Sequence, residues 1–168
     1  APTIEGVVSE SNLVRDYNFD DWSDANNLVS WSGSDAGIIS KQTLATRSPS
    51  GSNDYAMRFN TQGSHVSQSV TVQGNSVYQI RAIASSSNAS EGTIDMEISG
   101  AYTQLTWNGI TGPAGTYHQT RDDFYTSGSV GVNQTLKLTF TAVSASSDVK
   151  PLLDSVFVER WEGAHFSD

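Results

Sequence analysis

Arginine and glutamine side chains recur at alternate positions of short apolar runs, where they could bind a polar ligand. In residues 77–84, Gln79 and Arg81 fall on one face of an extended chain, and most of the apolar side chains fall on the other. A guanidinium can hold a carboxylate through two parallel hydrogen bonds, and an amide can bind hydroxyl groups. If residues 117–125 keep a matching register, the predicted polar face comprises Arg58, Gln79, Arg81, Gln119 and Arg121.

The charge of the ligand stays open between two possibilities. Several arginines on one face, in a chain with only 9 basic residues, favour an acidic polymer such as the uronic-acid polysaccharide alginate. The same arginines could instead pair with carboxylates of the chain, which would neutralise the face and leave a neutral β-glucan or mannan as the ligand. The acids considered for that pairing are Asp95, Glu97, Asp122 and Asp123.

Two tryptophans are predicted to be exposed. Trp22 lies among acidic residues and serine, and Trp107 lies in the glycine-rich segment 100–115, which has no clean period. The apolar C–H faces of sugar rings stack on aromatic planes, so both are candidate ligand contacts, together with Tyr102 and Gln104. In the alternative interpretation each tryptophan caps an edge of the fold. The aromatic residues in alternating runs are assigned to the core: Trp31, Phe59, Tyr78, Phe140 and Phe157.

The elements that must position these side chains are short β-strands. Ser, Thr, Asn and Gly are interleaved with β-branched runs, and turn signals recur about every ten residues, which is typical of an all-β protein. About nine or ten antiparallel strands suit a two-sheet jelly-roll β-sandwich. An opening strand is expected at 12–14. Further strands are predicted at 55–59, 66–72, 77–84, 93–99, 117–125, 136–140 and 151–158.

Length and charge exclude several classes of protein. The chain has 168 residues, so residues 1–168 are expected to form a single module with a core at about 12–159 and short tails. The net charge of −9 argues against nucleic-acid binding, which needs a basic surface. No apolar run approaches the ~20 residues that span a bilayer, and the absence of cysteine excludes disulfides and thiolate metal sites. The start Ala1-Pro2-Thr3 is typical of a trimmed mature protein or an excised domain.

Several short motifs also follow one another in a characteristic order. They are Asn12-Leu13-Val14, Asn18-Phe19-Asp20, Trp31, Tyr55-Ala56-Met57-Arg58-Phe59, Val70-Thr71-Val72, Tyr78-Gln79-Ile80-Arg81-Ala82 and Leu152-Leu153-Asp154-Ser155-Val156. Together they resemble the β-sandwich carbohydrate-binding modules of the group containing families four, nine, sixteen and twenty-two, family sixteen above all. The resemblance implies a galactose-binding-like jelly roll, a structural calcium ion and glycan binding without catalysis. Such modules are usually attached to secreted polysaccharide-degrading enzymes.

The resemblance also implies which residues would hold the calcium ion. The matching side chains are Asp20 and Asp154, and the matching carbonyls are those of Asn18 and of the loop at Ser50 and Asp54. Calcium accepts six to eight oxygens and takes carbonyls beside carboxylates, so this donor set is suitable. Asp21 could replace Asp20. In the alternative interpretation these acids are ordinary surface or turn residues.

Two other classes of function remain alternatives. A glycosidase needs two carboxylates about 5–10 Å apart across a cleft. The candidate pairs are Asp95 with Glu97 and Asp122 with Asp123, but such neighbouring acids on a solvated strand usually serve only solubility. A polysaccharide lyase would need a base near the C5 proton of the sugar beside a charge-neutralising group. The residues available for these roles are His65, His118, Tyr117 and Arg121. No Gly-x-Ser-x-Gly motif supports a serine hydrolase. The last alternative is a structural or adhesion module that binds no glycan.

The sequence therefore predicts a secreted, monomeric, calcium-stabilised β-sandwich that holds a covalently linked enzyme near a polysaccharide. Because such a site is shallow and wet, its affinity is expected to be micromolar to millimolar, about 4–8 kcal/mol. No nucleic acid and no membrane is expected among its partners.

Overall fold

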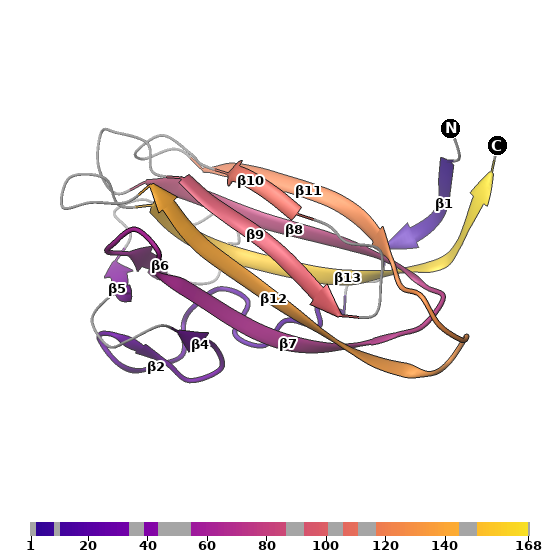
Figure 1. Ribbon diagram of the computed structural model, residues 1–168, viewed down its shortest axis with the longest axis horizontal. Helices are drawn as coiled ribbons and strands as arrows, with labels where there is room; N and C mark the ends of the chain where they lie inside the picture. The colour runs from indigo at the N-terminus through magenta and orange to yellow at the C-terminus, as the bar shows by residue number, and fades with distance from the viewer. Residues whose placement is uncertain are drawn as a thin grey trace.

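A computed structural model of the chain describes residues 3–8, 11–33, 39–43, 55–86, 93–100, 106–110, 117–144 and 151–167. Within these ranges the secondary structure is entirely β, and none of it is a helix that could cross a membrane. Two antiparallel sheets lie one over the other, as Figure 1 shows. The predicted two-sheet β-sandwich is therefore confirmed.

The first sheet has the strand order β11-β8-β13-β6-β5, and β1 pairs with β13 off this path. Its strands are β1 (Thr3–Val8), β5 (Ile39–Thr43), β6 (Tyr55–Phe59), β8 (Val77–Ser86), β11 (His118–Tyr125) and β13 (Pro151–Ser167).

The second sheet has the order β10-β9-β12-β7-β4, and a separate small hairpin joins β2 and β3. These strands are β2 (Trp22–Asp24), β3 (Asn27–Leu28), β4 (Ser32–Gly33), β7 (His65–Gln73), β9 (Thr93–Gly100), β10 (Thr106–Ile110) and β12 (Asn133–Ser144).

The core lies between the two sheets and follows the predicted alternation. In β9, Ile94, Met96 and Ile98 are buried, whereas Glu97 is exposed on the outward face. Aromatic rings continue the packing, since the rings of Trp31 and Phe140 lie 6.3 Å apart between centroids. Of the aromatic residues assigned to the core, Trp31, Phe59, Tyr78 and Phe140 are buried there. Period-two alternation of apolar side chains thus explains which face of each strand is buried.

The opening strand expected at 12–14 does not form. These residues instead run beside β13, where the N–H of Leu13 donates to the carbonyl of Val158 at 2.9 Å. The Asn12 side chain holds this arrangement. Its Oδ1 accepts hydrogen bonds from the N–H groups of Val14 and Val158, both at 3.0 Å, and its Nδ2 donates to the carbonyl of Val156 at 3.2 Å. A side chain therefore replaces part of the ladder that a regular strand would have made.

Replacing Asn12 with alanine is expected to lower the free energy of unfolding by about 2 kcal/mol, because backbone groups of β13 lose their partners. Urea denaturation followed by tryptophan fluorescence measures the change. Asn12→Asp is the matched control, because a carboxylate keeps the two acceptor bonds and loses only the donor, so its loss should be smaller. Equal losses in the two variants would contradict the assignment of two acceptor bonds to Oδ1.

The two ends of the chain form a two-stranded ribbon. β13 continues past the predicted end at residue 158, and its last part pairs with β1 from Val8 opposite Trp161 to Thr3 opposite Ser167. Figure 1 shows the ribbon leaving one end of the sandwich with both termini at its tip. The tails expected outside the core are thus paired with each other.

Candidate functional site

The outward face of β8 and β11 carries the polar residues predicted from alternation. Arg81 lies opposite Arg121, Gln79 lies opposite Asp123, and Gln119 lies opposite Ile83. Residues directly opposite each other in an antiparallel pair project from the same face of the sheet. The register therefore brings Gln79, Arg81, Gln119 and Arg121 together on one surface.

Arg81 is already engaged by a neighbouring strand. Its Nη2 lies 3.0 Å from Oε1 of Glu159, a buried carboxylate on β13, and its guanidinium carbon lies 4.1 Å from the centroid of the Phe157 ring. None of the acids considered in the sequence analysis is its partner in this ion pair. Phe157, which was assigned to the core, lies half-buried on the outward face because it is opposite Arg81. The positive charge of Arg81 is thus balanced within the protein.

Arg58 lies on the same side of the sheet but in a different group of side chains. Its Nε donates to Oγ of Ser40 at 3.1 Å and to Oδ1 of Asn60 at 2.9 Å. It is opposite Leu152, whereas Arg81 is opposite Phe157 further along β13. Arg58 therefore ties β5 to β6 and does not join the surface around Arg81.

A shallow hollow of about 250 Å³ lies beside Arg81 on this face. We call it the sheet-face hollow. Its lining residues are Gln79, Arg121, Asp122, Asp123 and Trp161. The indole Nε1 of Trp161 donates to Oδ1 of Asp123 at 2.7 Å, which holds a half-buried aromatic ring at the edge of the hollow.

Sequence reasoning missed Trp161 because it ended the last strand at residue 158. The alternation of that strand continues, however, and places Trp161 on the same face as Phe157 and Glu159. Extending the period by three residues would have found it.

The two tryptophans predicted to be exposed have different environments. Trp107, in β10, is only 8% exposed and belongs to the core, where it lies opposite Met96 of β9. The expectation of an exposed Trp107 on a loop is therefore wrong. The pairing of β10 with β9 is irregular after Trp107, and Gly109 in this irregularity adopts a φ of +68°. The N–H of Gly109 donates to Oδ1 of Asp95 at 2.7 Å, which keeps the segment attached to β9.

Trp22 is half-buried. It packs against the core, and its Nε1 donates to the carbonyl of Phe19 at 2.7 Å. It lies in the β2–β3 hairpin, away from the strands that line the sheet-face hollow. Tyr102 and Gln104, the other residues predicted near the binding surface, lie outside the described residues.

The turn that carries Asp20 is organised by Asp16. Oδ1 of Asp16 accepts hydrogen bonds from the N–H groups of Asp20 at 2.8 Å and Asp21 at 3.1 Å. Burial raises the pKa of Asp16 above its ordinary value, and the negative charges of Asp21 and Asp20 act in the same direction. The side chains of Asp20 and Asp21 are exposed, so both acids sit on the solvent side of this turn.

Asp154 has the opposite environment, because it is fully buried. It is the extra residue at a register shift between Leu153 and Ser155 in β13, and its Oδ2 accepts a hydrogen bond from Oγ of Ser155 at 2.7 Å. Its charge reaches Tyr117, whose pKa is raised by burial first and by the negative charge of Asp154 second.

Only part of the predicted calcium site can be placed. The carbonyl of Tyr17 accepts a hydrogen bond from the N–H of Val156 at 2.9 Å, so the segment that contains Asn18 is tied to β13 two residues after Asp154. Ser50 and Asp54 lie outside the described residues. Across the described ranges, no group of three or more His, Cys, Asp or Glu side chains could hold a metal ion. The exposed Asp20 and the buried Asp154 thus lie in different surroundings.

The outward face of the second sheet has a polar hollow of its own, of about 280 Å³. It is lined mainly by hydroxyl, amide and carboxylate side chains of β9, β10 and β12, among them Asp95, Glu97, Asn108 and Thr139. Of the two acids Asp95 and Glu97, Asp95 already accepts a hydrogen bond from the N–H of Gly109 and so helps to hold β10 against β9.

Comparison with known proteins connects the fold to one group of binding domains. The chain is similar to a family 61 carbohydrate-binding module solved with β-1,4-galactotriose (TM-score 0.57, 12% identity, 90% of this chain and 99% of that one). It is also similar to a family 16 carbohydrate-binding module (TM-score 0.58, 14% identity, 88% and 99%). Modules of families 4 and 22 are among the similar structures too.

The chain has the fold of a carbohydrate-binding module. The resemblance noted in the sequence thus agrees with the structural likeness. A cyclase from Fischerella sp. TAU shares this fold as well (TM-score 0.67, 10% identity, 93% and 98%), so the fold by itself is compatible with catalysis. No protein-family model and no curated protein matches the sequence.

Proposed function

We propose that this chain is a non-catalytic carbohydrate-binding module whose glycan contacts the sheet-face hollow. The observation that carries the proposal is the Trp161 ring, which is held by Asp123 beside the amide of Gln79 and the guanidinium of Arg121. An aromatic plane next to convergent hydrogen-bonding groups is the combination that sugar rings require, since they present apolar C–H faces and a rim of hydroxyls.

The charges around the hollow favour a neutral glycan over an acidic one. The lining contains one arginine, Arg121, and two acids, Asp122 and Asp123. The neighbouring Arg81 is balanced by Glu159. A uronate would therefore meet more negative than positive charge, whereas carboxylates accept hydrogen bonds from neutral hydroxyls. A β-glucan or mannan fits this surface better than alginate.

The proposed biological role is to hold a covalently linked polysaccharide-degrading enzyme at its substrate outside the cell, as a monomer. The support is the fold shared with carbohydrate-binding modules and the sequence resemblance.

A structural calcium ion at the bulge of β13 is part of the same proposal. The support for the ion is that Asp154 is a fully buried carboxylate, and that Tyr17, the residue before Asn18, accepts a hydrogen bond from Val156 of the same strand. Asp20 and Asp154 would supply carboxylates to the ion, and Asn18 and the loop at Ser50 and Asp54 would supply carbonyls. When bound, calcium supplies a fixed positive charge that balances a carboxylate removed from water.

The glycan proposal is tested by affinity electrophoresis against laminarin, xylan, mannan and alginate, with a cellulose pull-down beside it. We expect retention by a neutral glycan and none by alginate. Arg121→Ala should weaken that retention about tenfold, because a hydrogen bond to a charged group is lost. Lys137→Ala is the matched control, since it removes an exposed positive charge from the second sheet and should change nothing.

Other outcomes separate the alternatives. Retention by alginate that disappears in Arg121→Ala would favour an acidic ligand. Retention by no glycan would favour a structural or adhesion module. Release of reducing ends, or of unsaturated products absorbing at 235 nm, would show catalysis.

A further inference from the structure

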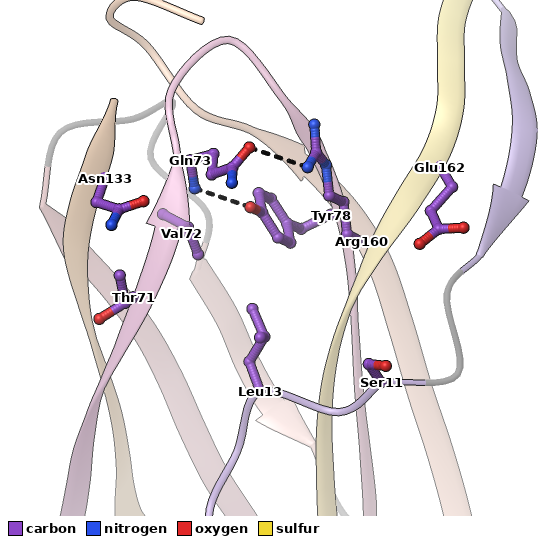
Figure 2. Close-up of a pocket in the computed structure, with 9 residues that line it drawn as sticks. All are labelled: Ser11, Leu13, Thr71, Val72, Gln73, Tyr78, Asn133, Arg160 and Glu162. Atoms are coloured by element: carbon purple, nitrogen blue, oxygen red, sulfur yellow. Dashed lines mark hydrogen bonds between the residues drawn. The ribbon is translucent and has the colours of Figure 1, made fainter. Parts of the chain in front are cut away.

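A second cleft, of about 280 Å³, lies at the end of the sandwich from which the terminal ribbon leaves. Figure 2 shows it between β7 and β12 on one side and β13 on the other. Leu13, Val72 and Tyr78 lie at its base, where Val72 and Tyr78 are almost fully buried and Leu13 is half-buried. Its rim carries polar side chains, including Gln73, Asn133, Arg160 and Glu162. We call it the edge cleft.

The polar groups of the edge cleft are held in place before any ligand arrives. Nη1 of Arg160 donates to Oε1 of Gln73 at 3.0 Å, and its Nη2 donates to Oγ of Ser76 at 3.3 Å. The N–H of Gln73 in turn donates to the hydroxyl of Tyr78 at 2.8 Å (Figure 2). A guanidinium has further N–H donors, and the Tyr78 hydroxyl keeps its own proton, so hydrogen-bonding capacity remains after these contacts. Such preorganisation reduces the entropy lost on binding.

The edge cleft is separate from the sheet-face hollow, although β8 and β13 contribute residues to both. Arg160 is opposite Tyr78, whereas Glu159 is opposite Gln79. Successive residues of a strand project to opposite faces, so Tyr78 and Arg160 belong to the cleft side and Gln79 and Trp161 to the hollow side. The sheet itself therefore divides the two sites.

We propose that the edge cleft is a second binding site that takes a single neutral, hydroxyl-rich ring, such as the terminal pyranose of a glycan. The half-buried Leu13 side chain can contact the C–H groups of a pyranose, and the polar rim matches its hydroxyls. Arg160 and Glu162 carry opposite charges, so the rim favours a neutral ligand over an ion. At about 280 Å³ the cleft is as small as the smallest ligand pockets, so it has room for one ring inside it. The ligand class, but not the location, rests on the proposed function.

The test is an NMR titration of the ¹⁵N-labelled chain with free glucose, mannose and galactose, each up to about 100 mM because weak sites of this kind bind in the millimolar range. At least one sugar should shift the amide signals of Gln73, Tyr78 and Arg160 and leave those of Gln79 and Arg121 unchanged. Arg160→Gln should abolish the shifts. Asn133→Ala, which removes an exposed rim side chain, should weaken them even if Arg160→Gln fails to fold. Lys137→Gln is the charge-matched control and should keep them.

A parallel titration with oligosaccharides of the retained glycan separates the two proposals. Shifts at the hollow without any at the cleft, with either probe, would overturn the edge-cleft proposal and leave the proposed function standing. Monosaccharide shifts at the cleft without oligosaccharide shifts at the hollow would support the edge cleft and refute the hollow as the glycan site. Monosaccharide shifts spread evenly over the surface would overturn the edge cleft.

Discussion

The Trp161→Ala variant is expected to bind the retained glycan about 30-fold more weakly than the parent chain. Trp161 supplies the aromatic plane of the sheet-face hollow, and its hydrogen bond to Asp123 fixes the ring before binding. Removing a well-placed aromatic residue from the centre of a binding site costs about 2 kcal/mol, which corresponds to this loss. Isothermal titration calorimetry with an oligosaccharide of the retained glycan measures it.

Two variants make the Trp161 result specific. Trp161→Phe keeps an aromatic plane but loses the N–H that donates to Asp123, so its affinity should fall between those of the parent and the alanine variant. Trp22→Ala changes the other partly exposed tryptophan, which lies in the β2–β3 hairpin, and should leave affinity unchanged. If Trp22→Ala lost affinity and Trp161→Ala kept it, the glycan would lie elsewhere. Unfolding midpoints of all three variants exclude loss of folding as the cause.

Removal of calcium is expected to lower the melting temperature by about 5 to 10 °C. A ligand present at about 100 times its dissociation constant stabilises the folded state by about 2.7 kcal/mol, and each kcal/mol shifts the midpoint of a domain of this size by about 2–4 °C. The physical cause is Asp154, whose fully buried carboxylate is costly to keep charged without a cation. Differential scanning calorimetry with and without chelator measures the shift.

Variants at the acids identify which carboxylate responds to calcium. Asp154→Asn should remove the difference between calcium and chelator, because it neutralises the buried ligand. Asp122→Asn, at an exposed acid on β11, is the matched control and should keep the full difference. Asp20→Asn distinguishes the two predicted carboxylate ligands, since Asp20 is exposed and its loss should matter less. Identical melting curves of the parent chain in calcium and in chelator would refute the metal proposal.

The strands illustrate what local pattern can predict. β6 spans Tyr55–Phe59, as predicted, and β7, β8 and β9 extend their predicted ranges by one or two residues. β11 begins one residue later than predicted, at His118. The strand predicted at 12–14 was wrong because Asn12 makes its hydrogen bonds to β13 through its side chain, and alternation does not report such contacts. Trp107 was wrongly predicted to be exposed on a loop, because a glycine at positive φ lets an irregular sequence remain inside the sheet.

The sequence by itself determined that the chain is all-β, which residues share a face of each strand, and that Gln79 and Arg81 point away from the core. These features are local, because alternation repeats every two residues and needs no partner strand. Only the tertiary structure decided that Arg81 pairs with Glu159, that Trp161 meets Asp123, and that Arg160 meets Gln73. Each of these contacts joins strands far apart in the chain, and their relative register depends on the packing of the whole sandwich.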